Sequence, residues 1–211
     1  GRVPEVPSSD LFYHQLATSG PMGRNVEDTI RLLHSIAGYD SRFPLSRRDR
    51  VPPFDDFRPA ELTGYRIGWM GDYDGYLPTE PGLMELCQSA LQGIAGQGAI
   101  VEDCRPDYDM ARLWQTWLTF RHWALGGARD LYDDVELRKL LKPEFVWEIE
   151  GSFGMPASQV DKAGIARADW YRALHSLFET YDILALPTAQ VFPFDADIQW
   201  TLNYTTRPMT D

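Results

Sequence analysis

Two short apolar runs with a helical pattern between them constrain the fold of this chain more than any other feature. The runs Tyr65–Met70 and Ala99–Asp103 have the length and the β-branched and aromatic content typical of buried strands. From Glu80 or Pro81 to about Gln97, apolar side chains recur on one face of a helix, and proline suits its first turn. Strand, helix and strand over about forty residues predict a βαβ unit. Such a unit has parallel strands and a right-handed crossover.

Other segments extend this unit along the chain. Residues 25–38 have the pattern of an amphipathic helix that Asn25 can cap, and residues 158–181 that of a long helix. The long helix carries one apolar side, which consists of Ile165, Trp170, Leu174, Leu177 and Phe178. The run 182–187 is continuously apolar, which is typical of the middle of a parallel or mixed sheet. We therefore expect 65–70, 99–103 and 182–187 to be strands of one sheet.

Charge and composition exclude several classes of protein. The 211 residues include 20 basic and 31 acidic side chains, and the formal net charge is −11. This charge argues against direct binding of nucleic acid or of an anionic membrane surface. No stretch has the apolar length needed to span a bilayer. Two cysteines, Cys87 and Cys104, are too few for a disulfide scaffold, so we expect a reducing compartment and a cytoplasmic location.

Motifs for metals, cofactors and common nucleophiles are missing from the sequence. None of the four histidines has a second ligand at the spacing of a metal site, so no metal is predicted. There is no glycine-rich phosphate loop, and no cofactor is predicted. No G-x-S-x-G nucleophile motif is present either. Buried apolar thiols are a better interpretation of the two cysteines than a redox pair.

A helix predicted over residues 109–131 is unusually rich in aromatic side chains. Three tryptophans fall within ten residues, and Trp114, Trp117 and Arg121 share one face because they lie three and four residues apart. Core packing explains most of these rings. The alternative is the apolar wall of a ligand pocket, in which Arg121 would fix the orientation of the ligand.

Several segments, in order along the chain, resemble the amidase-signature enzymes. Gly20–Asp28 is similar to the family's G-P-M-x-R-x-V-x-D segment, and Leu62–Trp69 to its L-x-G-x-R-I-G-[WY] strand. Tyr181–Thr188 resembles its Y-D-x-L-x-x-P-T run. Further matches are Gly1–Pro4, Leu32–Asp40, Gly98–Glu102 and Pro193-Phe194. Together these matches span nearly the whole chain.

The resemblance implies a fold, a chemistry and a set of pocket residues. It implies a single α/β domain over residues 1–211, with a mixed β-sheet covered by helices. It also implies hydrolysis of a linear carboxylic amide by a serine nucleophile, a second serine and a lysine base. The chain has no Gly/Ser-rich run and no lysine before Lys139, so no catalytic residue can be assigned. We expect an interior or C-terminal piece whose partner is the missing N-terminal part of the same polypeptide. The pocket candidates are Trp114, Trp117, Leu118, Arg121, Pro187, Thr188 and Ala189.

Three functions remain open at this point. The first is an amidase that acts on a small-molecule amide. The second, in the same family, is the ammonia-releasing subunit of a glutamine-dependent aminoacyl-tRNA amidotransferase, which passes ammonia to a partner enzyme. The third is a non-catalytic ligand-binding or scaffold domain. A piece of a sheet should expose an apolar face or edge, so self-association, for example as a homodimer, or poor stability in solution is also expected.

Overall fold

A computed structural model describes residues 1–5, 10–12, 16–49, 51–53 and 61–198 of the chain. The chain divides into two compact units, Gly1–Ala60 and Glu61–Asp211. The sheet and the longest of the described helices belong to the second unit.

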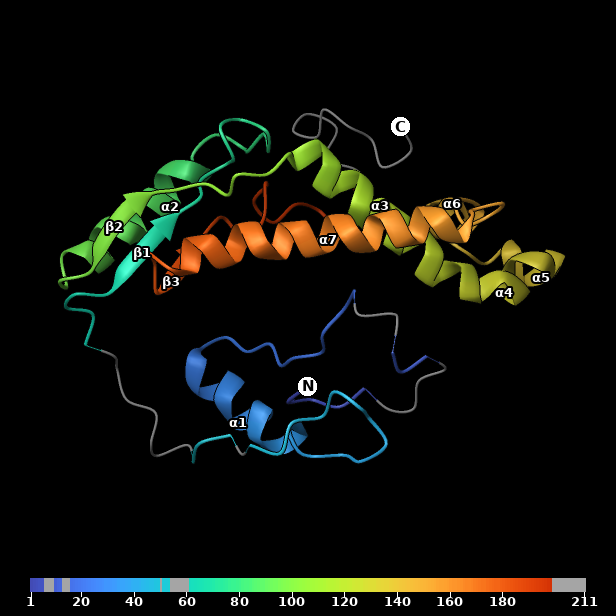
Figure 1. The fold of residues 1–211 in the computed structure, drawn as a ribbon, viewed down its shortest axis with the longest axis horizontal. Coiled ribbons are helices and arrows are strands. Elements are labelled where there is room, and N and C mark those ends of the chain that lie inside the picture. The colour runs from blue at the N-terminus through green and yellow to red at the C-terminus, as the bar shows by residue number, and fades with distance from the viewer. Residues whose placement is uncertain (6–9, 13–15, 50, 54–60, 199–211) are drawn as a thin grey trace. The chain divides into compact units, whose positions relative to one another are not determined.

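The second unit contains a three-stranded parallel sheet. Its strands are β1 (Arg66–Trp69), β2 (Ile100–Asp103) and β3 (Ile183–Ala185), in the order β2-β1-β3 (Figure 1). Arg66 pairs with Ile100, and Ile67 pairs with Ile183. The expectation that these three runs share one sheet is therefore confirmed, as is the α/β class. All three strands are parallel to one another.

The position of the last strand differs from the sequence prediction. Its continuous apolar run predicts a central strand, but β3 lies at an edge of the three described strands, and Ile183 is exposed. The central strand is β1, in which Ile67, Gly68 and Trp69 are all buried. An apolar strand at an edge is an open pairing surface, because one row of its backbone groups has no neighbouring strand.

One face of the sheet is covered by α2 (Leu83–Ala95). The core there consists of Ile67, Trp69, Leu91 and Ala99. Alternation along a strand turns Gly68 to the opposite face. A Cβ atom at Gly68 would lie 2.5 Å from Cys104 Sγ, so only glycine allows this close approach. Cys87 packs instead against the α2 core, and both cysteines are free thiols.

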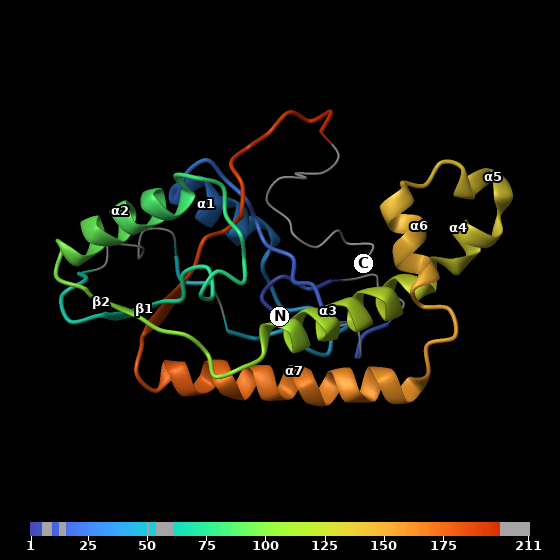
Figure 2. The ribbon, with the colours of Figure 1, turned by 90° about the horizontal axis from the view of Figure 1, so that it is seen from above.

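Two long helices form the other half of this unit. Helix α3 (Met110–Leu125) packs along α7 (Ala157–Phe178), as Figure 2 shows. The side of α7 that is buried carries Ala163 and Ala166, while Ile165 and Phe178 of the predicted apolar side are exposed. Trp170, Leu174 and Leu177 of that side are half-buried, so the prediction for this side holds only in part. The Tyr108 hydroxyl donates to the carbonyl of Ala166 at 2.7 Å across this contact.

Short helices form a lobe at the end of α3 and α7 that is far from the sheet (Figures 1 and 2). After the 3₁₀ turn η2 (Gly126–Ala128) come α4 (Arg129–Asp133), α5 (Val135–Arg138) and α6 (Pro143–Glu150). Gly126 ends α3, so this helix is shorter than the one predicted over residues 109–131. Helix α6 packs against α3 and holds the one side chain with less than 2% exposure among the described residues, Ile149.

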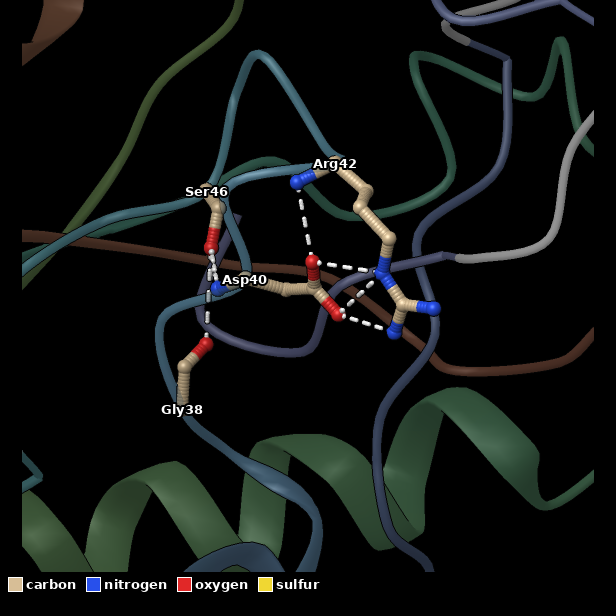
Figure 3. Close-up of polar contacts among 4 residues, drawn as sticks. All are labelled: Gly38, Asp40, Arg42 and Ser46. Carbon is tan, nitrogen blue, oxygen red and sulfur yellow. Dashed lines mark hydrogen bonds and ion pairs between the residues drawn. The ribbon is translucent and has the colours of Figure 1, made fainter.

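The described residues of the first unit include helix α1 and a turn in which Asp40 is held by Arg42. Helix α1 (Val26–Ile36) is capped by Asn25, whose side chain accepts from the Asp28 backbone at 2.8 Å, as predicted. After α1, the Asp40 carboxylate accepts from the Arg42 backbone at 2.9 Å and from Arg42 Nη2 at 2.6 Å (Figure 3). The Arg42 side chain, followed by its backbone N–H, lowers the pKa of Asp40 to about 2.

Candidate functional site

Stacked tryptophans and an arginine line up on one side of α3. The helix begins at Met110 because the Asp109 side chain accepts from the Ala111 backbone at 2.8 Å. The rings of Trp114 and Trp117 are stacked, with centroids 5.0 Å apart and planes 16° apart. The Arg121 guanidinium carbon lies 5.9 Å from the Trp117 ring centre. The structure therefore brings three of the predicted pocket residues into one row.

The guanidinium of Arg121 is bound to a carboxylate that the sequence analysis missed. Arg121 Nε lies 2.5 Å from Glu148 Oε1, and Nη2 lies 3.2 Å from Oε2. Glu148 belongs to α6 and is only 5% exposed. This bidentate contact uses the Nε/Nη2 edge of the guanidinium, whose geometry matches a carboxylate. Arg121, which was expected to orient a ligand, is thus paired with a glutamate of the protein itself.

A second contact between the same helices fixes the neighbouring histidine. His122 Nδ1 lies 2.9 Å from the backbone carbonyl oxygen of Glu148, and the His122 ring meets the Trp147 ring edge-on at 4.6 Å. A Cβ atom at Gly151 would overlap the His122 ring. Glycine at this position therefore lets α6 end against α3.

The remaining pocket candidates lie in two different environments. Leu118 is 8% exposed and belongs to the buried side of α3. Pro187 is half-buried, and Thr188 and Ala189 are exposed after the end of β3. Among the contacts described, none joins these three residues to the tryptophans of α3. Their segment is held by Gln190, whose carbonyl accepts from the Glu80 backbone at 2.8 Å.

A hollow of about 580 Å³ lies at the carboxyl ends of β1 and β2. Its lining includes Trp69, Tyr73, Gln88, Asp103 and Cys104. Burial raises the pKa of the Tyr73 hydroxyl and of the Cys104 thiol, and both groups therefore stay neutral near pH 7.

These residues and Glu148 were not predicted as site residues. The sequence signal for the hollow is that several of its residues directly follow the predicted strands. Residues at the carboxyl ends of parallel strands meet at one edge of the sheet. The signal for Glu148 is a lone acid between the apolar residues Trp147 and Ile149. An acid on the buried side of a helix needs a partner.

Among the described residues, no group of three histidine, cysteine or acidic side chains could hold a metal ion. In the same part of the chain, no helix has both the length and the apolar character to cross a membrane.

The chain is similar to known proteins along nearly its whole length. The amidase family model matches residues 1–209. An acylamidase from Rhodococcus erythropolis is 23% identical over 192 residues, which cover 89% of this chain and 39% of that protein. A glutamyl-tRNA(Gln) amidotransferase subunit from Pseudomonas putida (strain GB-1) is 33% identical over 92 residues, or 44% of this chain and 19% of that protein.

The fold has a solved counterpart. The crystal structure of a bacterial aryl acylamidase of the amidase-signature enzymes superposes with a TM-score of 0.76 at 21% identity, covering 92% of this chain and 41% of that one. The family match and the shared fold define the class: this chain belongs to the amidase family. It spans about two-fifths of the length of the acylamidase and of the aryl acylamidase.

Proposed function

We propose that the polypeptide carrying this chain is an amidase that hydrolyses a linear carboxylic amide to an acid and ammonia. The observation that carries the proposal is the family match over residues 1–209, with the row of Trp114, Trp117 and Arg121 on α3. In this proposal the chain supplies pocket and scaffold, and the reactive serines and lysine come from the part of the polypeptide before Gly1. A cytoplasmic location belongs to the same proposal and is supported by the two free cysteines.

The proposed reaction requires groups of known type. A serine oxygen attacks the amide carbonyl while a neutral lysine takes its proton through the second serine. Backbone N–H groups stabilise the oxyanion that forms. This chain would hold the acyl part of the substrate in place while those steps occur.

The row of Trp114, Trp117 and Arg121 on α3 favours a substrate whose acyl group is neutral and flat. The stacked rings of Trp114 and Trp117 offer apolar faces. Glu148 holds Nε and Nη2 of Arg121 beside them and balances its charge, which makes Arg121 a poorer anchor for a substrate carboxylate. Pro187, Thr188 and Ala189 stay in the proposal as a second wall at the end of β3.

A second candidate is the ammonia-releasing subunit of an aminoacyl-tRNA amidotransferase. The 33% identity to an amidotransferase subunit over 92 residues favours it. That activity would need a glutamine substrate, whose charged α-carboxylate calls for a free cation in the pocket. Glu148 already balances the charge of Arg121, which favours the amidase over this candidate.

The test uses the complete polypeptide and measures release of ammonia. A neutral aromatic amide and glutamine are compared at equal concentrations, with no partner protein present. The amidase predicts turnover of the aromatic amide. Turnover of glutamine only after a partner is added would favour the amidotransferase, and no turnover of either would favour the non-catalytic domain. Chain 1–211 alone should release no ammonia.

A pair of variants tests the role of α3. Trp117→Leu in the complete polypeptide should raise KM for the aromatic amide about tenfold with little change in kcat, because it removes binding shared by ground and transition states. The matched control is Tyr171→Leu, an exposed aromatic of α7 outside the row. Equal kinetics for the two variants would remove Trp117 from the proposed pocket.

A further inference from the structure

Arg121 keeps hydrogen-bond donors that its contact with Glu148 does not use. A guanidinium carries five N–H donors. The N–H of Nε and one N–H of Nη2 donate to the two carboxylate oxygens of Glu148, at 2.5 and 3.2 Å. The second N–H of Nη2 and both of Nη1 have no acceptor among the residues that the structure describes. The arginine side chain is 40% exposed, so these donors are open to a ligand.

Glu148 fixes the place of these donors. Its side chain is 6% exposed, and the bidentate contact sets the plane of the guanidinium. The backbone of Glu148 is held as well, because its carbonyl oxygen lies 2.9 Å from Nδ1 of His122, the residue that follows Arg121 on α3. A donor that is held in place before a ligand arrives loses less conformational entropy on binding. Arg121 is therefore prepared as a hydrogen-bond donor.

The charge of the pair determines which acceptor fits. Arg121 and Glu148 carry opposite unit charges, so together they are neutral. A substrate carboxylate at the remaining donors would place a second negative charge beside Glu148, and like charges in contact are unfavourable. A carbonyl oxygen adds no charge and accepts the same hydrogen bonds. The remaining donors thus fit a neutral acceptor better than an anion.

These donors lie beside the ring to which the proposed function assigns the acyl group. The guanidinium carbon of Arg121 is 5.9 Å from the centre of the Trp117 ring, on which the Trp114 ring is stacked. We propose that Arg121 donates a hydrogen bond to a neutral oxygen of the acyl group, and that Glu148 is the positioning residue behind this selectivity. The substrate class is a neutral aromatic amide whose acyl group carries a carbonyl oxygen. This inference rests on the proposed amidase activity.

The first test measures KM and kcat of the complete polypeptide for three kinds of benzamide, each as its meta and its para isomer. An acetyl substituent supplies the neutral acceptor, an isopropyl group has a similar shape without an acceptor, and a carboxylate is the charged counterpart. The KM for the better acetyl isomer should be about tenfold below that for its isopropyl match at similar kcat, because the hydrogen bond is shared by ground and transition states. The carboxylate compound should be the poorest substrate.

The outcomes of this test distinguish the inference from the proposed function. Turnover of the benzamides with equal KM for the acetyl and isopropyl compounds would overturn the inference and leave the amidase in place. Failure to hydrolyse any benzamide would overturn the proposed hydrolysis of aromatic amides, and the inference with it. Arg121→Met should remove the preference for the acetyl compound, and a preference that survives in this variant would overturn the role of Arg121.

Variants of Glu148 test positioning apart from stability. Glu148→Gln leaves the charge of Arg121 unbalanced, so kcat/KM for the carboxylate compound should rise about tenfold relative to the acetyl compound. Loss of folding cannot produce such a gain. Glu148→Asp keeps the charge and should keep the carboxylate compound poorest. The matched control is Glu136→Gln, which removes an acid from an exposed pair with Lys139 and should leave the ratio unchanged.

Two results would overturn the role of Glu148. One is an unchanged ratio in Glu148→Gln that circular dichroism shows to be folded. The other is an equal rise of the ratio in Glu136→Gln, which would assign the effect to net charge. If Glu148→Gln does not fold, the wild-type series and Arg121→Met still decide whether Arg121 is the donor, and a carboxylate compound that is no longer the poorest substrate of Glu148→Asp would count against the positioning role.

Discussion

Arg121 and Glu148 join α3 to α6 by a two-pronged ion pair, with 2.5 Å between Nε and Oε1. The two ends of the pair lie in different surroundings, since the arginine side chain is 40% and the glutamate side chain 6% exposed. Removal of Arg121 would leave the buried carboxylate of Glu148 without a counter-charge. The loss of one partner should therefore lower the free energy of unfolding by more than the intact pair contributes.

The first prediction concerns this ion pair. Arg121→Met should lower the free energy of unfolding by about 2 kcal/mol, below the range for fully buried pairs because the arginine is part-exposed. Urea unfolding of the folded chain, followed by circular dichroism, measures the change.

The matched control is Arg129→Met, which removes the exposed pair between Arg129 and Asp133. Its effect should stay below about 0.5 kcal/mol. Equal losses of unfolding free energy in the two variants would mean that the burial of Glu148 does not increase the cost of breaking its ion pair.

A second prediction concerns the end of α6. Gly151→Ala should lower the free energy of unfolding by about 2–3 kcal/mol, because the new methyl group would overlap the His122 ring. Thermal and urea unfolding check the value. The comparison is Gly164→Ala in α7, where no atom lies within 4 Å of the added Cβ. That variant should stabilise the chain by about 0.5–1 kcal/mol, since alanine favours the helix.

A third prediction concerns the close contact between Gly68 of β1 and Cys104. Gly68→Ala should cost about 2 kcal/mol, because its Cβ would lie 2.5 Å from Cys104 Sγ. Adding Cys104→Ala removes that sulfur, so the double variant should cost about 1 kcal/mol less than the sum of the single variants. A double-mutant cycle of unfolding free energies measures this coupling. Simple additivity would place the strain at Tyr181 or Leu184, which lie 2.9 and 3.0 Å from the same Cβ position.

A fourth prediction follows from the carboxylate of Asp40. Its pKa of about 2 is below the ordinary 3.8, so the folded state binds this proton more weakly than the unfolded state does. The stability that Asp40 contributes should be complete above about pH 5 and be lost progressively as the pH falls towards 2. Carboxyl carbon shifts in a pH titration by NMR report the pKa directly.

The control for Asp40 uses two arginines. Arg42→Gln should raise the pKa of Asp40 part of the way to its ordinary value, because the backbone N–H of residue 42 still donates to the carboxylate. Arg47→Gln, whose side chain pairs with Asp49 instead, should leave the pKa of Asp40 unchanged. A shift caused by Arg47→Gln would assign the effect to general charge and not to the contact.

The sequence by itself indicated the three strands, the helices α1, α2, α3 and α7, and the family. Local patterns suffice for this, because a helix such as α1 needs only a cap and a periodic apolar face, and a strand such as β1 needs only a short apolar run. The row of Trp114, Trp117 and Arg121 follows from helical spacing in the same way.

Only the tertiary structure decided which groups those side chains meet. Glu148 lies 27 residues from Arg121, and Cys104 lies 36 residues from Gly68. The apolar run of β3 does not reveal that it lies at an edge of the described sheet, and the pattern of α7 does not reveal that its alanines face α3. Partners so distant along the chain are set by the packing of whole elements, and periodicity within one element carries no information about them.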